Sequence, residues 1–257
     1  EANPGGAPCN VLAMLTKLGH KTAFIGKVGE DFFGEQLRDA ITEVGIDADG
    51  LCTDKEIHTT LAMVHTYPDG DRDFSFYRNP GADMMLNKEE ICEDIIKETK
   101  IFHFGTLSMT HEEVREATKE AIRIAEESGA VISFDPNLRP PLWNSLDEAK
   151  EQVLYGLKHC HILKISDNEI QWLTGEEDYT AGVNWIRERY QIPLILVSMG
   201  KEGSRAYYNG MMVEAKPFLQ KNTIETTGAG DTFCGCVLHY ICEHGMEGLE
   251  EENLKEM

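Results

Sequence analysis

Positively charged residues are scarce in this sequence. Its 257 residues include 24 Lys and Arg against 45 Asp and Glu, which gives a formal net charge of −21 at pH 7. Such a surface repels nucleic acid and anionic lipid at long range. We therefore expect neither nucleic acid nor a membrane as a partner. A small anionic ligand fits this charge only where positive groups, backbone N–H donors or a metal ion gather locally.

Long apolar runs and a disulfide framework are also lacking. No apolar run reaches the ~18 residues that a membrane span needs. The cysteines number seven, and Cys92, Cys160 and Cys236 lie within apolar patterns. This usage indicates reduced thiols in a cytoplasmic protein. Hydrophobic residues make up 41% of the chain, which is enough for a sizeable core and excludes a disordered chain.

Strand-like and helix-like patterns alternate along the chain. Short apolar runs are typical of parallel strands buried on both faces of a sheet. The alternation predicts an α/β fold with a parallel sheet between helices. The expected strands are residues 22–28, 101–104, 131–134, 162–165 and 194–197, and the expected helices are residues 7–18, 31–44, 112–127, 147–157 and 179–189.

Two segments read instead as β-hairpins. Residues 61–67 and 74–78 flank a turn of Pro, Asp and Gly, and residues 205–208 and 211–215 flank Asn209 and Gly210. The first hairpin has no place in a parallel sheet, so we expect residues 57–80 to project as a small β-lid. An exposed strand edge invites another strand, which makes this lid the candidate contact of a homodimer.

A glycine-rich segment near the end of the sequence carries the strongest chemical signal. Gly228 and Gly230 flank Ala229 just before a predicted apolar helix. Backbone N–H groups at such a helix start form an anion cradle. Asp231 then lies in the first helical turn, where a carboxylate accepts the proton of a hydroxyl that attacks a bound phosphate. An ordinary tight turn with Asp231 matching the helix dipole explains the same residues.

Two further segments suit a polyol or a phosphate. Gly5 and Gly6 precede a predicted helix and allow close backbone approach, and Asn10 offers an amide donor and acceptor. Arg139 follows a predicted strand and offers the positive charge that phosphate binding needs in an acidic protein. Each also has a plain explanation, since paired glycines before a helix are common and Arg139 can simply pair with Asp135.

Two more segments lie at predicted strand ends. Glu169 can hold a metal ion through water, whereas N-capping around Asp167 accounts for the same pattern. The turn at residues 198–203 fits a nucleotide or has no ligand at all.

Together these segments resemble the PfkB, or ribokinase-like, family of carbohydrate kinases from Pro4 to about Tyr240. The amino-terminal signature of the family is similar to residues 5–10, 18–19 and 24–34, and the carboxy-terminal signature to residues 226–233. Residues 77–83 and 135–140 look most like those of bacterial fructokinases. The resemblance implies a ribokinase-like fold, with one kinase domain over residues 1–257 that is shorter at both ends than its relatives.

The function that the resemblance implies is ATP-dependent phosphorylation of a primary hydroxyl of D-fructose, with Mg²⁺ and K⁺ as cofactors. Sugar and ATP are then the small-molecule partners. By matching position, the catalytic residues are Asp231, Gly228, Ala229 and Gly230; the sugar contacts are Gly5, Gly6, Asn10, Arg78 and Arg139; the nucleotide contacts are Lys164, Ser198, Gly200, Gly203 and Thr226; and the metal contacts are Glu169 for Mg²⁺ and Glu225 and Thr227 for K⁺.

The sequence departs from the family pattern at two of these places. Ser166 stands where many relatives carry the Asn of an Asn-x-x-Glu motif, and Glu225 stands where many carry Asp. The alternative activity is that of a 2-keto-3-deoxygluconate kinase, whose substrate carries a carboxylate, or of another PfkB-type sugar kinase. A sugar- or nucleotide-binding member of the fold without turnover is the second alternative.

Cysteine and histidine also gather on the predicted last helix. Cys234, Cys236, His239 and Cys242 lie within nine positions of one another. Helical residues two apart face different sides, so Cys234 and Cys236 do not readily share one metal ion. We expect core and helix-surface roles for these side chains.

Overall fold

The computed structural model describes residues 3–66, 72–217, 228–247 and 249–256. Its centre is a six-stranded sheet in the order β10-β9-β8-β7-β6-β5. Four strands run parallel and end within one residue of the predicted positions, and the predicted second hairpin extends the sheet in antiparallel fashion. The strands are β5 (Ile101–Gly105), β6 (Val131–Asp135), β7 (Ile162–Ser166), β8 (Leu194–Ser198), β9 (Ser204–Tyr208) and β10 (Met211–Ala215).

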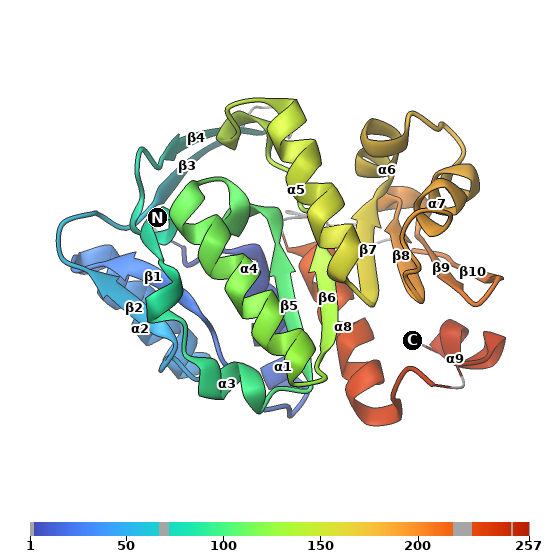
Figure 1. Cartoon of the computed structure of the whole chain (residues 1–257), viewed down its shortest axis with the longest axis horizontal. Helices are drawn as coiled ribbons and strands as arrows, with labels where there is room; N and C mark the ends of the chain where they lie inside the picture. Colours follow the sequence, from blue (N-terminus) through green and yellow to red (C-terminus); the bar gives the residue numbers. More distant parts are fainter. Residues whose placement is uncertain (1–2, 67–71, 218–227, 248, 257) are drawn as a thin grey trace.

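Helices cover both faces of this sheet, as predicted (Figure 1). Successive strand residues point to opposite faces, so Leu163 and Ile165 join one apolar core while Ile162 joins the other. The first core includes residues of α3 (Glu93–Lys97), α4 (Glu112–Glu127), α5 (Leu146–His159), α6 (Asp167–Thr174) and α7 (Tyr179–Arg187), and the second includes residues of α1 (Ala7–Lys17), α8 (Ala229–His244) and α9 (Glu251–Glu256). The predicted α/β fold is therefore confirmed.

A smaller parallel sheet lies beside the central one. It pairs β1 (Gly26–Gly29) with β2 (Leu51–Asp54) and packs against α2 (Phe32–Val44). The sequence predicted this first strand over residues 22–28, and that extent is wrong because β1 covers only Gly26–Gly29. Ala23 forms a single bridge with Asp47, because the neighbouring chain there is a loop and the ladder starts only where β2 starts.

The first hairpin forms a third sheet of its own, as its sequence predicted. Strands β3 (Leu61–Thr66) and β4 (Arg72–Tyr77) pair in antiparallel register. Figure 1 shows them crossing above the start of α4. Met63, Val64 and Tyr77 are exposed on this hairpin.

Short 3-10 helices complete the described elements. None of the helices in the described part of the chain is long and apolar enough to cross a membrane. The 3-10 helices are Ala82–Met85, Lys88–Glu90, Thr106–Met109, Pro140–Leu142 and Gly200–Glu202.

Candidate active site

The carboxyl ends of the parallel strands meet at one edge of the central sheet, where ligands of open α/β sheets bind. Gly105 and Asp135 are paired at the ends of β5 and β6, and Ser166 and Ser198 at the ends of β7 and β8. A cavity of about 50 Å³ opens at the ends of β5 and β6. Its lining residues are Ala7, Pro8, His103, Gly105, Thr106, Leu107, Ser108, Asp135 and Asn137.

The first turn of α8 brings the two signature segments together at this edge. Asn10 on α1 donates a hydrogen bond from Nδ2 to Oδ2 of Asp231 over 2.8 Å, although the two residues are 221 positions apart. Asp231 is only 9% exposed. Gly228 precedes the helix with φ +79°, a left-handed conformation that favours glycine. The first backbone N–H groups of a helix have no hydrogen-bond partner within that helix. At the start of α8, such N–H donors therefore lie close to the Asp231 carboxylate.

A buried ion pair lies directly beneath this turn. Lys164 on β7 bonds Asp135 on β6 at 2.9 Å between Nζ and Oδ2. A Cβ placed on Gly230 would lie 3.2 Å from the Lys164 ammonium, so the glycine lets α8 sit close to that charge. The pair also shows that Asp135 meets Lys164 rather than the Arg139 partner considered from the sequence.

The surroundings of the Lys164–Asp135 pair set the charge of the Lys164 ammonium beneath the start of α8. Burial works to lower the pKa of Lys164, but the carboxylates of Asp135 and Glu169 more than offset it and hold that pKa above its ordinary value. Burial also raises the pKa of Asp135, and the Lys164 ammonium cancels only part of that effect. Lys164 therefore keeps its proton at neutral pH, within its ion pair with Asp135.

Sequence reasoning missed a second polar pair in the same place. His103 on β5 bonds Ser133 on β6, with 2.9 Å between Nδ1 and Oγ. Burial, helped by the charge of Lys164, lowers the pKa of His103 to about 4. The ring is thus neutral at physiological pH and lines the small cavity. A histidine inside an otherwise apolar strand was the one available signal.

Glu169 has both carboxylate oxygens engaged by the protein. Oε2 accepts hydrogen bonds from the Ser166 N–H at 2.8 Å and the Ser166 hydroxyl at 2.9 Å, and Oε1 accepts one from the Leu138 N–H at 2.7 Å. Ser166, not Asp167, is the N-cap of α6, and Glu169 completes the capping box. This network joins the ends of β6 and β7, and it leaves acceptor capacity on Oε1 for a water molecule.

The two candidate arginines differ in their surroundings. The Arg78 guanidinium is buried and donates to Asp83, Thr110 and the Leu107 carbonyl at 2.7–2.9 Å. It thereby ties the end of the hairpin to the loop after β5. Arg139 is exposed and donates to backbone carbonyls of its own loop.

The remaining candidates are placed as follows. Gly5 and Gly6 lie exposed just before α1, and a Cβ on Gly5 would meet nothing within 4 Å. Ser198 ends β8, and the following turn requires Gly203, because a Cβ there would lie 2.1 Å from the Ala215 carbonyl oxygen. Gly200 belongs to the same turn. Glu225, Thr226 and Thr227 lie outside the described residues.

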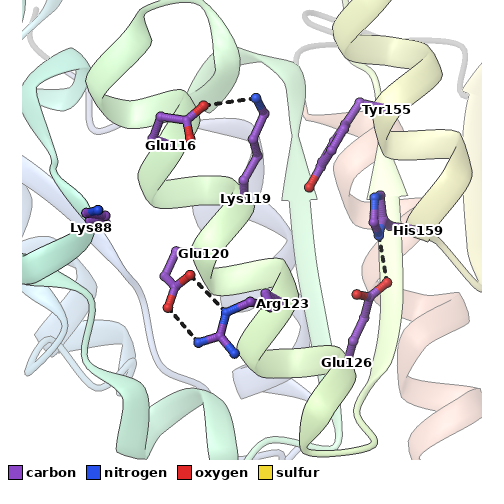
Figure 2. A pocket seen from close by; sticks show the side chains of 8 residues that line it. All are labelled: Lys88, Glu116, Lys119, Glu120, Arg123, Glu126, Tyr155 and His159. Carbon is purple, nitrogen blue, oxygen red and sulfur yellow. Dashed lines mark hydrogen bonds and ion pairs between the residues drawn. The ribbon is translucent and has the colours of Figure 1, made fainter.

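A larger cavity, of about 360 Å³, lies away from this edge between α4 and α5 (Figure 2). Its charged side chains mostly pair with each other: Lys119 with Glu116, Arg123 with Glu120, and His159 with Glu126. We therefore assign the site to the carboxyl edge and not to this groove.

The sequence and the fold of this chain are similar to those of known proteins. The pfkB family carbohydrate kinase profile matches residues 1–252. The chain belongs to this family of carbohydrate kinases, as the sequence predicted.

Its relatives in the family include fructokinases. The chain is 40% identical to probable fructokinase-4 of Arabidopsis thaliana, over 99% of this chain and 78% of that protein, and 41% identical to fructokinase-2 of Solanum habrochaites, over 99% and 77%. Among solved structures, the fructokinase of Xylella fastidiosa with bound ATP matches with a TM-score of 0.85 and 32% identity, over 93% of this chain and 74% of that chain. The Vibrio cholerae O395 fructokinase with fructose, ADP and calcium ion bound matches with a TM-score of 0.85 and 28% identity, over 98% and 80%.

Proposed function

We propose that this chain transfers the γ-phosphoryl group of ATP to a primary hydroxyl of D-fructose. The observation that carries the proposal is the Asn10–Asp231 hydrogen bond at the start of α8. It places a carboxylate beside backbone N–H donors at the edge of the sheet where ligands bind. The similarity to fructokinases, including one solved with fructose and ADP, supports this substrate pair.

In this mechanism Asp231 is the general base. The Asn10 amide holds Oδ2, so Oδ1 takes the proton from the attacking sugar hydroxyl. The N–H groups of Gly228, Ala229 and Gly230 stabilise the charge that builds on the transferred phosphoryl group. The Lys164 ammonium beneath the turn adds favourable potential.

Mg²⁺ supplies charge neutralisation at the β- and γ-phosphates when it is bound. Glu169 suits it through a water molecule, since Oε1 retains acceptor capacity while its other contacts fix the carboxylate. Binding of K⁺ through Glu225 and Thr227 stays a prediction from the sequence. It is tested by comparing initial rates in KCl and NaCl at constant ionic strength.

The sugar, in this proposal, lies against Gly5, Gly6 and Asn10 and extends into the small cavity beside α1. Arg78 acts as a positioning residue that holds the hairpin lid. Arg139, which is exposed and bonds carbonyl groups of its own loop, turns towards the substrate or its phosphate when they bind. The nucleotide lies along the ends of β7 and β8, near Lys164, Ser198, Gly200 and Gly203. A nucleotide contact from Thr226 stays a prediction from the sequence.

A coupled assay of ADP release tests the function. Fructose, 2-keto-3-deoxygluconate and a no-sugar control are compared at equal concentrations with MgATP. The proposal expects the highest kcat/KM with fructose. A higher value with 2-keto-3-deoxygluconate would assign the sugar-acid activity, and sugar binding without any ADP release would assign a non-catalytic member of the family.

A further inference from the structure

The two helices that carry Asn10 and Asp231 are also joined at their other ends. α1 and α8 pack side by side in the same direction, with Gly235 of α8 close to Met14 of α1. Just after α1, His20 Nε2 lies 2.7 Å from Nδ1 of His239 on α8. This contact lies at the opposite end of the helix pair from the proposed catalytic site.

A carboxylate completes a cluster of three potential metal ligands around this contact. Glu243 follows His239 by four positions, which places both on one face of α8. Its Oε1 lies 3.8 Å from His20 Nε2. The three ligand atoms all lie within 4.8 Å of one another. Cys234 and Cys236 were set aside as metal ligands because helical residues two positions apart face different sides. His239 and Glu243 are four positions apart, so that objection does not apply to them.

We propose that His20, His239 and Glu243 form a binding site for a divalent transition-metal ion, with Zn²⁺ the best fit. The bond from Zn²⁺ to a histidine nitrogen is ~2.0–2.1 Å long. In tetrahedral coordination, any two ligand atoms are therefore roughly 3.4 Å from each other. The observed separations of 2.7 and 3.8 Å lie on either side of that value. Two imidazoles and one carboxylate leave a fourth position for water, and nitrogen ligands disfavour Mg²⁺ and Ca²⁺.

The surroundings favour a cation as well. The site lies beside the last turns of α8, which ends at His244, and is therefore near the negative end of the helix dipole. The net charge of −21 adds to the attraction. Without metal, two facing imidazole nitrogens share one proton, whereas a metal ion uses both lone pairs. The ion would therefore join α1 to α8 and stabilise the pair of helices that positions Asn10 against Asp231.

The test measures metal binding directly on the nucleotide-free chain after treatment with a chelator. Thermal unfolding is followed with added Zn²⁺ or Mg²⁺, and Co²⁺ is titrated by visible absorption, which reports tetrahedral coordination. Zn²⁺ at about 100 times its Kd should raise the Tm by roughly 5–10 °C, and Mg²⁺ should not.

Three variants separate this site from other zinc ligands. His239→Phe keeps a ring but removes its nitrogens, and Glu243→Gln removes only the charge of a largely exposed side chain. Both should weaken Zn²⁺ binding at least tenfold, whereas His244→Phe, on the same helix, should bind as the unchanged chain does. Undiminished binding in Glu243→Gln and His239→Phe, no Zn²⁺ effect on the unchanged chain, or an equal shift with Mg²⁺ would overturn the proposal. Glu243→Gln decides the question if His239→Phe does not fold.

Discussion

At the scale of single residues, Asp231 lies in the first turn of α8 and accepts a hydrogen bond from the Asn10 amide. Asp231→Asn keeps the size and the contact with Asn10 but removes the base. We predict that kcat falls by roughly 10²–10⁴-fold, with the Tm within a few degrees of the original. Steady-state kinetics and a thermal melt measure both.

The matched control is Asp147→Asn, which changes an exposed aspartate in the first turn of α5. It should leave turnover unchanged. Turnover of Asp231→Asn close to that of this control would remove Asp231 from the role of base.

Asp31 gives a prediction about stability. Its carboxylate caps α2 through the Gly34 N–H and accepts two hydrogen bonds from Thr59. Burial works to raise the pKa of Asp31, but these bonds outweigh it and lower that pKa from 3.8 to about 2. A folded pKa below the unfolded one contributes stability above about pH 4, and this stability is lost as the pH falls towards 2.

Asp31→Asn should therefore lower the free energy of unfolding by about 2 kcal/mol at pH 6 and by about half as much at pH 3. Urea unfolding of both proteins at the two pH values measures the difference. A deficit that is the same at pH 6 and pH 3 would show that the charge of Asp31 is not what stabilises this cap.

The candidate site shows which residues a sequence can indicate. Gly228, Gly230 and Asp231 could be proposed from the sequence because they are close in the chain and share one local chemistry. The pairs Lys164–Asp135 and His103–Ser133 join neighbouring strands. Their partners depend on sheet order and register, which composition and spacing do not specify.

At the scale of elements, the sequence predicted those helices and strands whose buried residues follow a regular apolar pattern. The four parallel strands of the central sheet are short runs of mainly apolar residues, each with at most one polar residue before its last position, and α4 follows a clear helical repeat. β2 was not predicted because it is only four residues long and only its first residue is buried, so it forms no apolar run. α6 was not among the predicted helices, although N-capping around Asp167 was one explanation of its first residues and the Ser166–Glu169 capping box marks a helix start.

The hairpin gives the prediction for this scale. Met63 and Val64 are 56% and 52% exposed on a two-stranded sheet, and such a strand invites a second copy. We predict that the chain forms a homodimer through this lid and that Met63→Glu shifts it towards the monomer. Sedimentation velocity over a range of concentrations measures the change.

Met212→Glu is the control, because Met212 is 46% exposed on β10, at the edge of the central sheet. It should leave the dimer intact. A monomer at all concentrations for the unchanged chain, or equal dissociation in both variants, would contradict the lid as the contact.

At the scale of the whole molecule, the net charge of −21 opposes the approach of ATP but not of fructose. Salt screens this repulsion, with a Debye length of ~10 Å at 0.1 M. We predict that raising the ionic strength with tetramethylammonium chloride, at fixed Mg²⁺ and K⁺, lowers the KM for ATP by about two- to fivefold. The KM for fructose, measured in the same series, should stay constant. A KM for ATP that rises with salt would show that the positive charge of Lys164 and its surroundings outweighs the overall field.

The parallel pairing of α1 and α8 has a consequence for biosynthesis. Val11 and Leu15 of α1 are buried in the core that α8 completes, and Asn10 finds Asp231 only after 221 further positions. At ~5–20 residues per second, translation needs roughly 10–45 s to cover that separation. Throughout this interval the nascent chain displays the apolar stripe of α1 without its partner, so we expect chaperones that bind apolar segments to hold it on the ribosome until α8 emerges.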